Sequence, residues 1–225
     1  MIHSDIQKID FFTLLSDDKI DIISKMSNIE NYGKDNILYY EKTVSKKLYF
    51  LIDGLAKSYK IDKFENECFL YYIQPNEILS EITTFSNNIN DTDNNTILKS
   101  TYSNIIFLED SKVLSIDYKS FHKVMLETDI LTHSLANEVS KRNDKLELLI
   151  NREFIYDAVS KVAMMLENDL DIFNKLKKQE IALILHIQPS TLSRAINRLK
   201  RDEIIEIKNN TIYILNTDKL KNVYI

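Results

Sequence analysis

The chain has 225 residues, of which 44% are hydrophobic, and this is enough to bury a core in each of two modest domains. It contains one cysteine, which excludes an internal disulfide and any iron–sulfur or zinc site made only of cysteines from one chain. The sequence has no apolar run of membrane-spanning length and no basic-then-apolar N-terminal segment, so we expect a cytoplasmic protein without a membrane span.

The net charge of −5 is divided unevenly along the chain. Residues 151–225 hold 12 Lys and Arg against 10 Asp and Glu, whereas residues 1–150 hold 17 against 24. The C-terminal third is therefore slightly basic and the remainder is acidic. This asymmetry fits a local basic face for nucleic acid on a chain that is acidic elsewhere.

The N-terminal half has the pattern of a small antiparallel β-roll. Residues 9–26 are predicted to form short helices, with the cluster Ser16–Asp18 as a cap. From residue 32 to 116, runs rich in Ile, Leu, Tyr and Phe recur between polar turns at intervals of about ten residues. The clearest runs are residues 37–40, 47–52, 56–61 and 68–73. Asp53-Gly54 is a hairpin signal between two of these runs, and residues 86–95, with five Asn and two Asp, indicate a loop.

Past Tyr118 the apolar period becomes helical. Five apolar residues follow at steps of four, four, seven and three, which is close to a heptad seam: Leu131, Leu135, Val139, Leu146 and Leu149. A helix with such a seam needs a partner, and we expect a second copy of the chain. The alternative is that the seam packs against the roll of the same chain. The pattern ends at residues 151–154.

Residues 178–201 carry the pattern of two short helices set at an angle. Ile181, Ala182, Ile184 and Leu185 give the first helix an apolar face, and Ala182 is small enough to let a second helix cross closely. Residues 186–189 break the run, and Pro189 suits the first position of the next helix. The second helix buries Leu192, Ala195, Ile196 and Leu199. Its outward residues carry four positive charges and no acid: Ser190, Thr191, Ser193, Arg194, Asn197, Arg198, Lys200 and Arg201.

A helix over residues 154–170 precedes this pair, and a short hairpin follows it. The hairpin runs through residues 204–207 and 211–215, with Asn209-Asn210 as a turn that tolerates positive φ. Helix-turn-helix plus hairpin is a winged helix. Its hydroxyls suit phosphate oxygens and its guanidinium groups suit base edges, which favours DNA binding.

These patterns predict an α+β chain with three parts. Residues 1–117 form a double-stranded β-roll of the kind that binds cyclic nucleotides, residues 118–152 form a long dimerisation helix and hinge, and residues 153–225 form a winged helix-turn-helix DNA-binding domain.

In the order of these parts, the chain resembles the Crp/Fnr family of bacterial transcription regulators from about residue 10 to its end. Residues 179–182 (Gln-Glu-Ile-Ala) and 191–194 (Thr-Leu-Ser-Arg) are similar to the family's paired signature around its two DNA-binding helices. Residues 47–54 are similar to the strand and turn that open the roll's core. Residues 75–82 are similar to the Pro-Gly-Asp/Glu segment that follows.

The resemblance implies roles for particular residues. The arginine that corresponds to Arg194 reads a guanine through a bidentate contact in that family, which suits a planar guanidinium. Ser190 stands where the family has a base-reading glutamate, Pro189 stands at another base-contacting position, and Ser193 is left to make a short polar contact. The expected base-reading residues are therefore Arg194, Ser190 and Ser193, and the expected phosphate-binding residues are Lys178, Gln179, Gln188, Thr191 and Arg198.

The effector does not carry over from the family. Its cyclic-nucleotide binders use a Gly-Glu pair for the ribose and an Arg-Ser pair for the cyclic phosphate. Here these pairs read Ser80-Glu81 and Thr101-Tyr102, so the arginine is missing and cAMP is not expected. An iron–sulfur cluster would need more cysteines than Cys68. Single axial ligation by His122 or His133 keeps haem open, while His186 is read as structural; a redox signal, nitric oxide or no effector also remain.

We therefore expect a homodimeric transcription regulator that binds an inverted repeat through residues 190–201 and that also contacts RNA polymerase, as an activator or a repressor. No enzyme activity is expected. A cupin-like roll enzyme is an alternative, but it would need paired histidines in the strands, and residues 32–116 contain none. A second alternative is a winged helix that only contacts proteins. The expected cofactor is unknown and no metal site is predicted.

Overall fold

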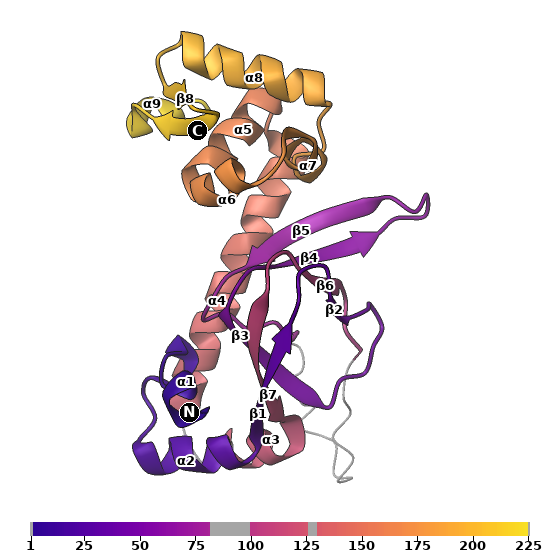
Figure 1. Ribbon diagram of the computed structural model, residues 1–225, viewed down its shortest axis with the longest axis vertical. Helices are drawn as coiled ribbons and strands as arrows, with labels where there is room; N and C mark the ends of the chain where they lie inside the picture. Colours follow the sequence, from indigo (N-terminus) through magenta and orange to yellow (C-terminus); the bar gives the residue numbers. More distant parts are fainter. Residues whose placement is uncertain (1, 82–99, 126–129, 225) are drawn as a thin grey trace. The chain divides into compact units, whose positions relative to one another are not determined.

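Figure 1 shows a computed structural model that describes residues 2–81, 100–125 and 130–224, without the side chains of residues 124, 125 and 130. The chain divides into two compact units, Met1–Lys145 and Leu146–Ile225. The loop predicted for residues 86–95 lies outside the described residues. Among the helices that are described, none has both the length and the apolar character that a membrane span requires.

The first unit begins with helices that cover one side of a sheet. These are α1 (Ile2–Ile6), the short 3₁₀ turn η1 (Asp10–Phe12) and α2 (Asp17–Lys25). Ser16 is the N-cap of α2, as its sequence position predicts, although its side chain makes no capping hydrogen bond. Phe11 and Phe12 of η1 pack with Phe50 and Phe121 in one aromatic cluster, with ring centroids 4.9–6.5 Å apart. Aromatic packing therefore fixes the entry helices to the roll.

Two antiparallel sheets make up the roll. One has the order β1-β7-β3, from strands β1 (Ser27–Tyr32), β7 (Ser111–Asp117) and β3 (Lys47–Asp53). The other has the order β2-β6-β4-β5, from β2 (Ile37–Tyr39), β6 (Asn104–Phe107), β4 (Ala56–Ile61) and β5 (Glu67–Ile73). The strand runs predicted from residue 37 to residue 73 are confirmed.

The sheet β1-β7-β3 is buried on both of its faces. Leu114 and Phe50 belong to the cluster that contains the helices, whereas Val113 and Leu51, one residue away in each strand, belong to the cluster shared with the second sheet. Successive side chains of a strand point to opposite faces. A strand buried on both faces must therefore be apolar almost throughout, which explains the continuous run at residues 48–52.

The hairpin predicted at Asp53-Gly54 is wrong. Strands β3 and β4 flank this turn but pair in different sheets, so the chain crosses from one sheet to the other there. Gly54 has φ +100°, and a Cβ at this position would lie 2.2 Å from the Ser111 hydroxyl oxygen. The glycine signal was thus a real requirement for positive φ and close backbone approach, not a hairpin turn.

Two helices follow the roll in the chain. Helix α3 (Tyr118–Met125) precedes the long helix α4 (Ile130–Ile150), and a π-helical turn, η3 (Asn151–Ile155), ends α4. The long helix and its termination near residue 151 agree with the sequence pattern.

The second unit contains helices α5 (Ala158–Asn168), α6 (Leu170–Lys175), α7 (Lys178–Ile184) and α8 (Pro189–Arg201), strands β8 (Ile205–Lys208) and β9 (Thr211–Ile214), and helix α9 (Thr217–Lys221). Asp157 caps α5, because its carboxylate accepts hydrogen bonds from the backbone N–H groups of Val159 and Ser160. Val162, Ala163 and Leu166 are fully buried, so α5 is the central support of this unit.

Candidate functional site

Helices α7 and α8 meet through a tight turn. His186 adopts φ +50°, the Ile187 N–H donates to the Ala182 carbonyl at 3.0 Å, and Gln188 is the N-cap of α8 with Pro189 in its first turn. Ala182 is 1% exposed, consistent with its predicted place at the helix crossing. The four residues predicted to anchor α8, from Leu192 to Leu199, are all buried. The helix-turn-helix is therefore rigidly seated, with the opposite side of α8 free.

Arg194 lies on this free side of α8. Its guanidinium donates to the Thr191 hydroxyl at 3.1 Å and to the Ser190 carbonyl at 3.4 Å, so the side chain lies back over the first turn of its own helix. The Ser193 hydroxyl donates to the Pro189 carbonyl at 3.1 Å. Ser190 is exposed. Of the three predicted base-reading residues, Arg194 has the reach and Ser190 the open position, while Ser193 spends its hydroxyl on the helix.

The predicted phosphate-binding residues fall into two groups. Lys178, Gln179 and Gln188 are exposed at the starts of α7 and α8, and Thr191 is half-buried beside Arg194. Arg198 is placed differently, because it faces Asp202 at 3.9 Å and lines a shallow recess with Asp157 and Asn222. Hydrogen bonds from the Ser160 backbone and, to a smaller degree, the charge of Arg198 lower the pKa of Asp157.

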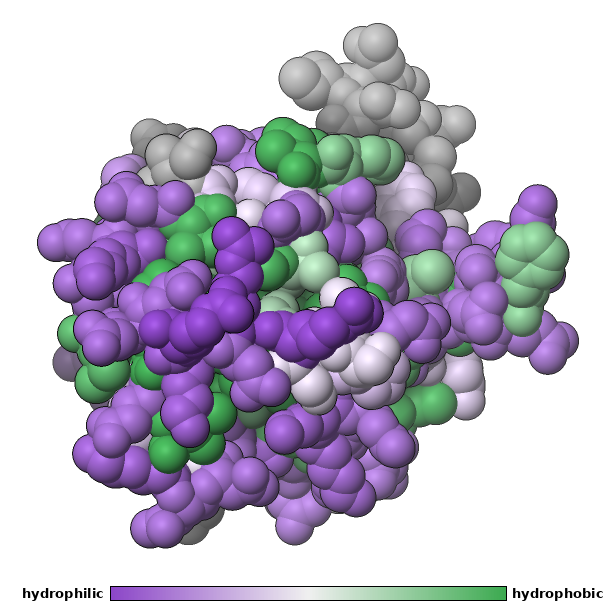
Figure 2. Space-filling view, turned by 90° about the horizontal axis from the view of Figure 1, so that it is seen from above, coloured by the Kyte–Doolittle hydropathy of each residue, from purple (hydrophilic) through white to green (hydrophobic). Residues whose placement is uncertain are grey.

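Strands β8 and β9 form the predicted wing. Asn209 and Asn210 have φ of 48° and 66°, the left-handed pair that a tight two-residue turn requires. Lys208 at the wing's tip pairs with Glu206 at 2.7 Å. Figure 2, which looks onto the side where α8 lies, shows strongly hydrophilic side chains over that helix.

The turn between α7 and α8 is also tied to η3. The Glu153 carboxylate lies 2.8 Å from His186 Nδ1 and 2.7 Å from Arg152 Nε. Burial of Glu153 opposes its ionisation, but the hydrogen bonds from His186 and Arg152 outweigh it, and the pKa of Glu153 is lowered. His186 therefore has a structural contact, as its sequence position suggests.

The exposed seam predicted along α4 does not form as one stripe. Leu131 is fully buried in the core of the first unit, Leu135 packs partly against that core, and Leu149 is half-buried. Glu138 and Ser134 on the same side are buried as well, and Arg142 donates to the Tyr71 hydroxyl and to the Ile78 carbonyl. The physical reason is that this side of α4 is occupied by the roll of its own chain.

A neighbouring stripe of α4 is exposed along its whole length. Its members are spaced by alternating steps of four and three and are Thr132, Ala136, Val139, Asn143, Leu146 and Ile150. Val139, Leu146 and Ile150 expose 48%, 44% and 54% of their surfaces. This is a heptad seam one residue away from three of the five predicted positions, and sequence spacing alone could not choose between the two.

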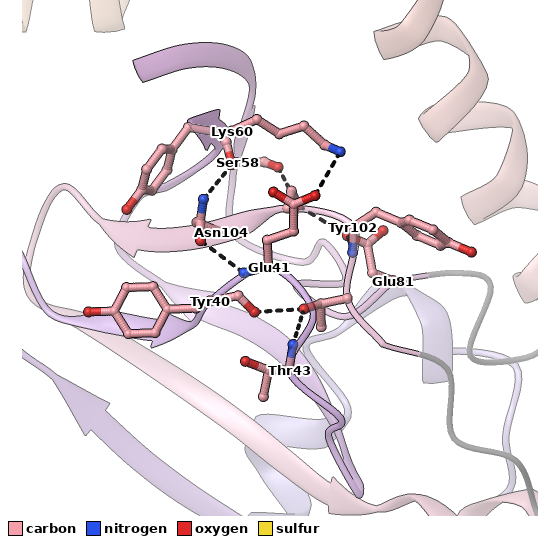
Figure 3. Close-up of polar contacts among 11 residues, drawn as sticks. Tyr40, Glu41, Thr43, Ser58, Lys60, Glu81, Tyr102 and Asn104 are labelled. Atoms are coloured by element: carbon pink, nitrogen blue, oxygen red, sulfur yellow. Dashed lines mark hydrogen bonds and ion pairs between the residues drawn. The ribbon is translucent and has the colours of Figure 1, made fainter. Parts of the chain in front are cut away.

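Figure 3 shows the polar cluster of the roll where Glu81 and residues 101–102 meet. The Glu81 carboxylate accepts hydrogen bonds from the Ser103 hydroxyl at 3.1 Å and from the Tyr102 N–H at 3.3 Å. Ser103 itself accepts from the buried Ser58 hydroxyl at 2.8 Å. The Thr101 hydroxyl donates to the Tyr40 carbonyl at 2.7 Å. The donors of this cluster are thus used by the protein itself.

The candidate haem and sensor residues do not converge. His122 lies against the Tyr118 ring, His133 is exposed on α4, and Cys68 is half-buried in β5. In the described part of the chain, no three His, Cys, Asp or Glu side chains form a group that could hold a metal ion.

A winged helix-turn-helix with a polar, cation-rich outer face defines a DNA-binding protein as its class. Residues 160–223 match the family model of the Crp-like helix-turn-helix domain. No curated protein matches the chain at the sequence level.

Solved structures of regulators have the same fold. FixK2 from Bradyrhizobium japonicum is 17% identical with a TM-score of 0.69, over 88% of this chain and 98% of that one. A CooA mutant from Carboxydothermus hydrogenoformans is 20% identical with a TM-score of 0.69, over 89% of both chains. A CRP-family regulator from Thermus thermophilus is 13% identical with a TM-score of 0.64, over 87% and 96%. The resemblance to the Crp/Fnr family is confirmed, and the chain is a transcription regulator of the Crp/Fnr type with a helix-turn-helix DNA-binding domain.

Proposed function

We propose that the protein binds an inverted DNA repeat as a homodimer, with one α8 in each of two successive major grooves. The observation that carries this proposal is the outer face of α8, where Arg194 is exposed above a fully buried anchor. A recognition helix enters the major groove with its N-terminal half against the base edges, and Arg194 lies in that half. A two-fold dimer places its half-sites about 34 Å apart.

Within this proposal, Arg194 reads guanine and Ser190 lies close to the bases, while Lys178, Gln179, Gln188 and Thr191 contact phosphates. Arg194 must leave Thr191 to reach a base, which frees the Thr191 hydroxyl for a phosphate oxygen at the same time. Arg198 is kept as a phosphate contact from the flank of α8.

The test is selection from randomised duplexes by the protein as purified, at two salt concentrations. Phosphate binding falls steeply with salt, whereas base reading survives as a sequence preference. We expect one inverted repeat to be enriched. Arg194→Ala is expected to cost about 1–3 kcal/mol at one base position of each half-site. If this variant keeps both affinity and selectivity, the assignment of Arg194 is wrong; if the wild-type protein selects nothing at either salt, the helix serves a protein contact instead.

The dimer is proposed along the exposed stripe of α4 from Thr132 to Ile150. Asn143 interrupts its apolar residues, and a polar residue at such a position selects register and oligomeric state at some cost in stability. Contact with RNA polymerase, as an activator or a repressor, belongs to the same proposal.

For the roll, we propose that cAMP is not the effector. The position that would need a fixed cation for the cyclic phosphate is Thr101, and a carboxylate, Glu81, already occupies the nearby donors. Thermal unfolding with cAMP, haem, or nitric oxide, each followed by DNA binding, tests this. We expect no shift with cAMP; a shift and tighter DNA binding with cAMP would contradict the proposal.

A further inference from the structure

The four buried residues of α8 define which side of the helix faces outward. With about 100° between successive residues, the side chains of Leu192, Ala195, Ile196 and Leu199 point in one mean direction, and the outward direction is opposite. Ser190, Arg194, Asn197 and Arg201 then lie within roughly 30° of that outward direction, whereas Ser193 and Arg198 lie roughly 70° away. The middle of the outward face therefore contains a residue, Asn197, to which no role has been given.

We propose that Asn197 reads a base, and that this base is adenine. The inference rests on the proposed DNA binding by α8. Asn197 is exposed, and within the described part of the chain its side chain makes no hydrogen bond. Its neighbours on α8 are occupied: Ser193 bonds the Pro189 carbonyl, and Arg201 and Arg198 lie 3.7 Å and 3.9 Å from Asp202.

The chemistry of the side chain selects the base. A carboxamide carries a donor and an acceptor side by side, and this pair matches the N7 acceptor and N6 donor on the major-groove edge of adenine. Guanine offers two acceptors at its edge and suits the guanidinium of Arg194 instead. The two residues therefore have different preferences on one face of one helix.

Geometry places the two contacts close together on the DNA. Asn197 follows Arg194 by three residues, which is about 4.5 Å along the helix axis. Base pairs are about 3.4 Å apart. We therefore expect the adenine read by Asn197 to lie one or two base pairs from the guanine read by Arg194, and Ser190, whose hydroxyl is short, to add little selectivity.

The experiment compares the full-length protein with Asn197→Ala, Arg194→Ala and Lys200→Ala in the same duplex selection. Lys200 is an exposed cation about 90° round the helix from the outward direction, so it is the matched control for a phosphate contact. Asn197→Ala is expected to lose about tenfold or more in preference at one adenine position and to leave the salt dependence unchanged. Lys200→Ala is expected to weaken all sequences alike and to reduce the salt slope by about one.

The outcomes separate the inference from the function on which it rests. A wild-type protein that selects no sequence contradicts DNA reading by α8 altogether. A wild-type protein that selects a site, with Asn197→Ala giving the same base preferences at every position, overturns the role of Asn197 alone. Asn197→Asp gives an independent check, because a carboxylate accepts from cytosine N4 but offers no donor. Retained adenine preference in that variant would also overturn the inference.

Discussion

The position of the dimer seam can be tested with two leucines that lie close together on α4. Leu146 is 44% exposed and belongs to the stripe from Thr132 to Ile150, whereas Leu148 is 38% exposed and lies about 160° round the helix. Full burial of a leucine is worth about 1.5–3 kcal/mol, so burying the exposed half of Leu146 contributes about 1 kcal/mol in each protomer. Because the substitution acts twice in a symmetric dimer, Leu146→Ala is expected to cost about 1.5–2 kcal/mol, or a 10- to 30-fold rise in the dimer Kd.

Sedimentation velocity over a range of protein concentrations measures this Kd directly. Leu148→Ala is the matched control and is expected to leave the Kd unchanged within about twofold, since Leu148 stays exposed. Equal weakening by both substitutions would refute the placement of the seam, and so would an unchanged dimer in Leu146→Ala. Circular dichroism of both variants shows whether the helix itself is intact.

Two further substitutions test the local structure. Asp157→Ala removes the N-cap of α5 and is expected to cost about 1 kcal/mol at neutral pH by urea unfolding; because the folded pKa of Asp157 is lowered, this stabilisation is present above its ordinary pKa of 3.8 and is lost as pH falls through the lowered value, so the variant and wild type should converge in acid. Gly54→Ala places a Cβ 2.2 Å from the Ser111 hydroxyl oxygen at φ +100° and is expected to destabilise by about 2 kcal/mol or more, whereas Gly33→Ala, whose Cβ meets nothing nearer than 3.7 Å, is expected to be close to neutral; similar losses in both would show that Gly54 is not constrained.

Local signals in the sequence were sufficient for the DNA-binding unit. The period of Leu192, Ala195, Ile196 and Leu199 fixes the buried side of α8, Pro189 begins the helix, and the two asparagines close the wing. Each of these features acts over a few residues. The strands of the roll were also predictable as strands, but their pairing was not, because it is decided by which faces become buried. Asp53-Gly54 shows the difference, since the turn residues were recognised and their partner strands were not.

The candidate site was predictable only where a residue's neighbours lie on its own helix. Arg194 and Thr191 are one turn apart, so their proximity follows from the sequence. The contact of Arg198 with the recess beside Asp157 depends on how α5 packs against α8, and no spacing along the chain reveals it. The same limit applies to α4, because apolar periodicity marks residues that need burial without saying whether the roll or a second chain supplies it. Leu131 is buried by the roll.

The roll and the recognition helix differ in how much of their chemistry remains available to a ligand. In the roll, the Glu81 carboxylate takes the Ser103 hydroxyl and the Tyr102 N–H, and the nearby Lys60 is paired with Glu41 at 3.1 Å. An incoming anion would meet a carboxylate of like charge and donors that are already bonded, so it would have to replace these contacts before gaining any of its own. On α8 the opposite holds, because Arg194 is held only by its own helix and can exchange those weak contacts for a base. The described structure is therefore prepared for DNA and closed to an anionic effector at this cluster.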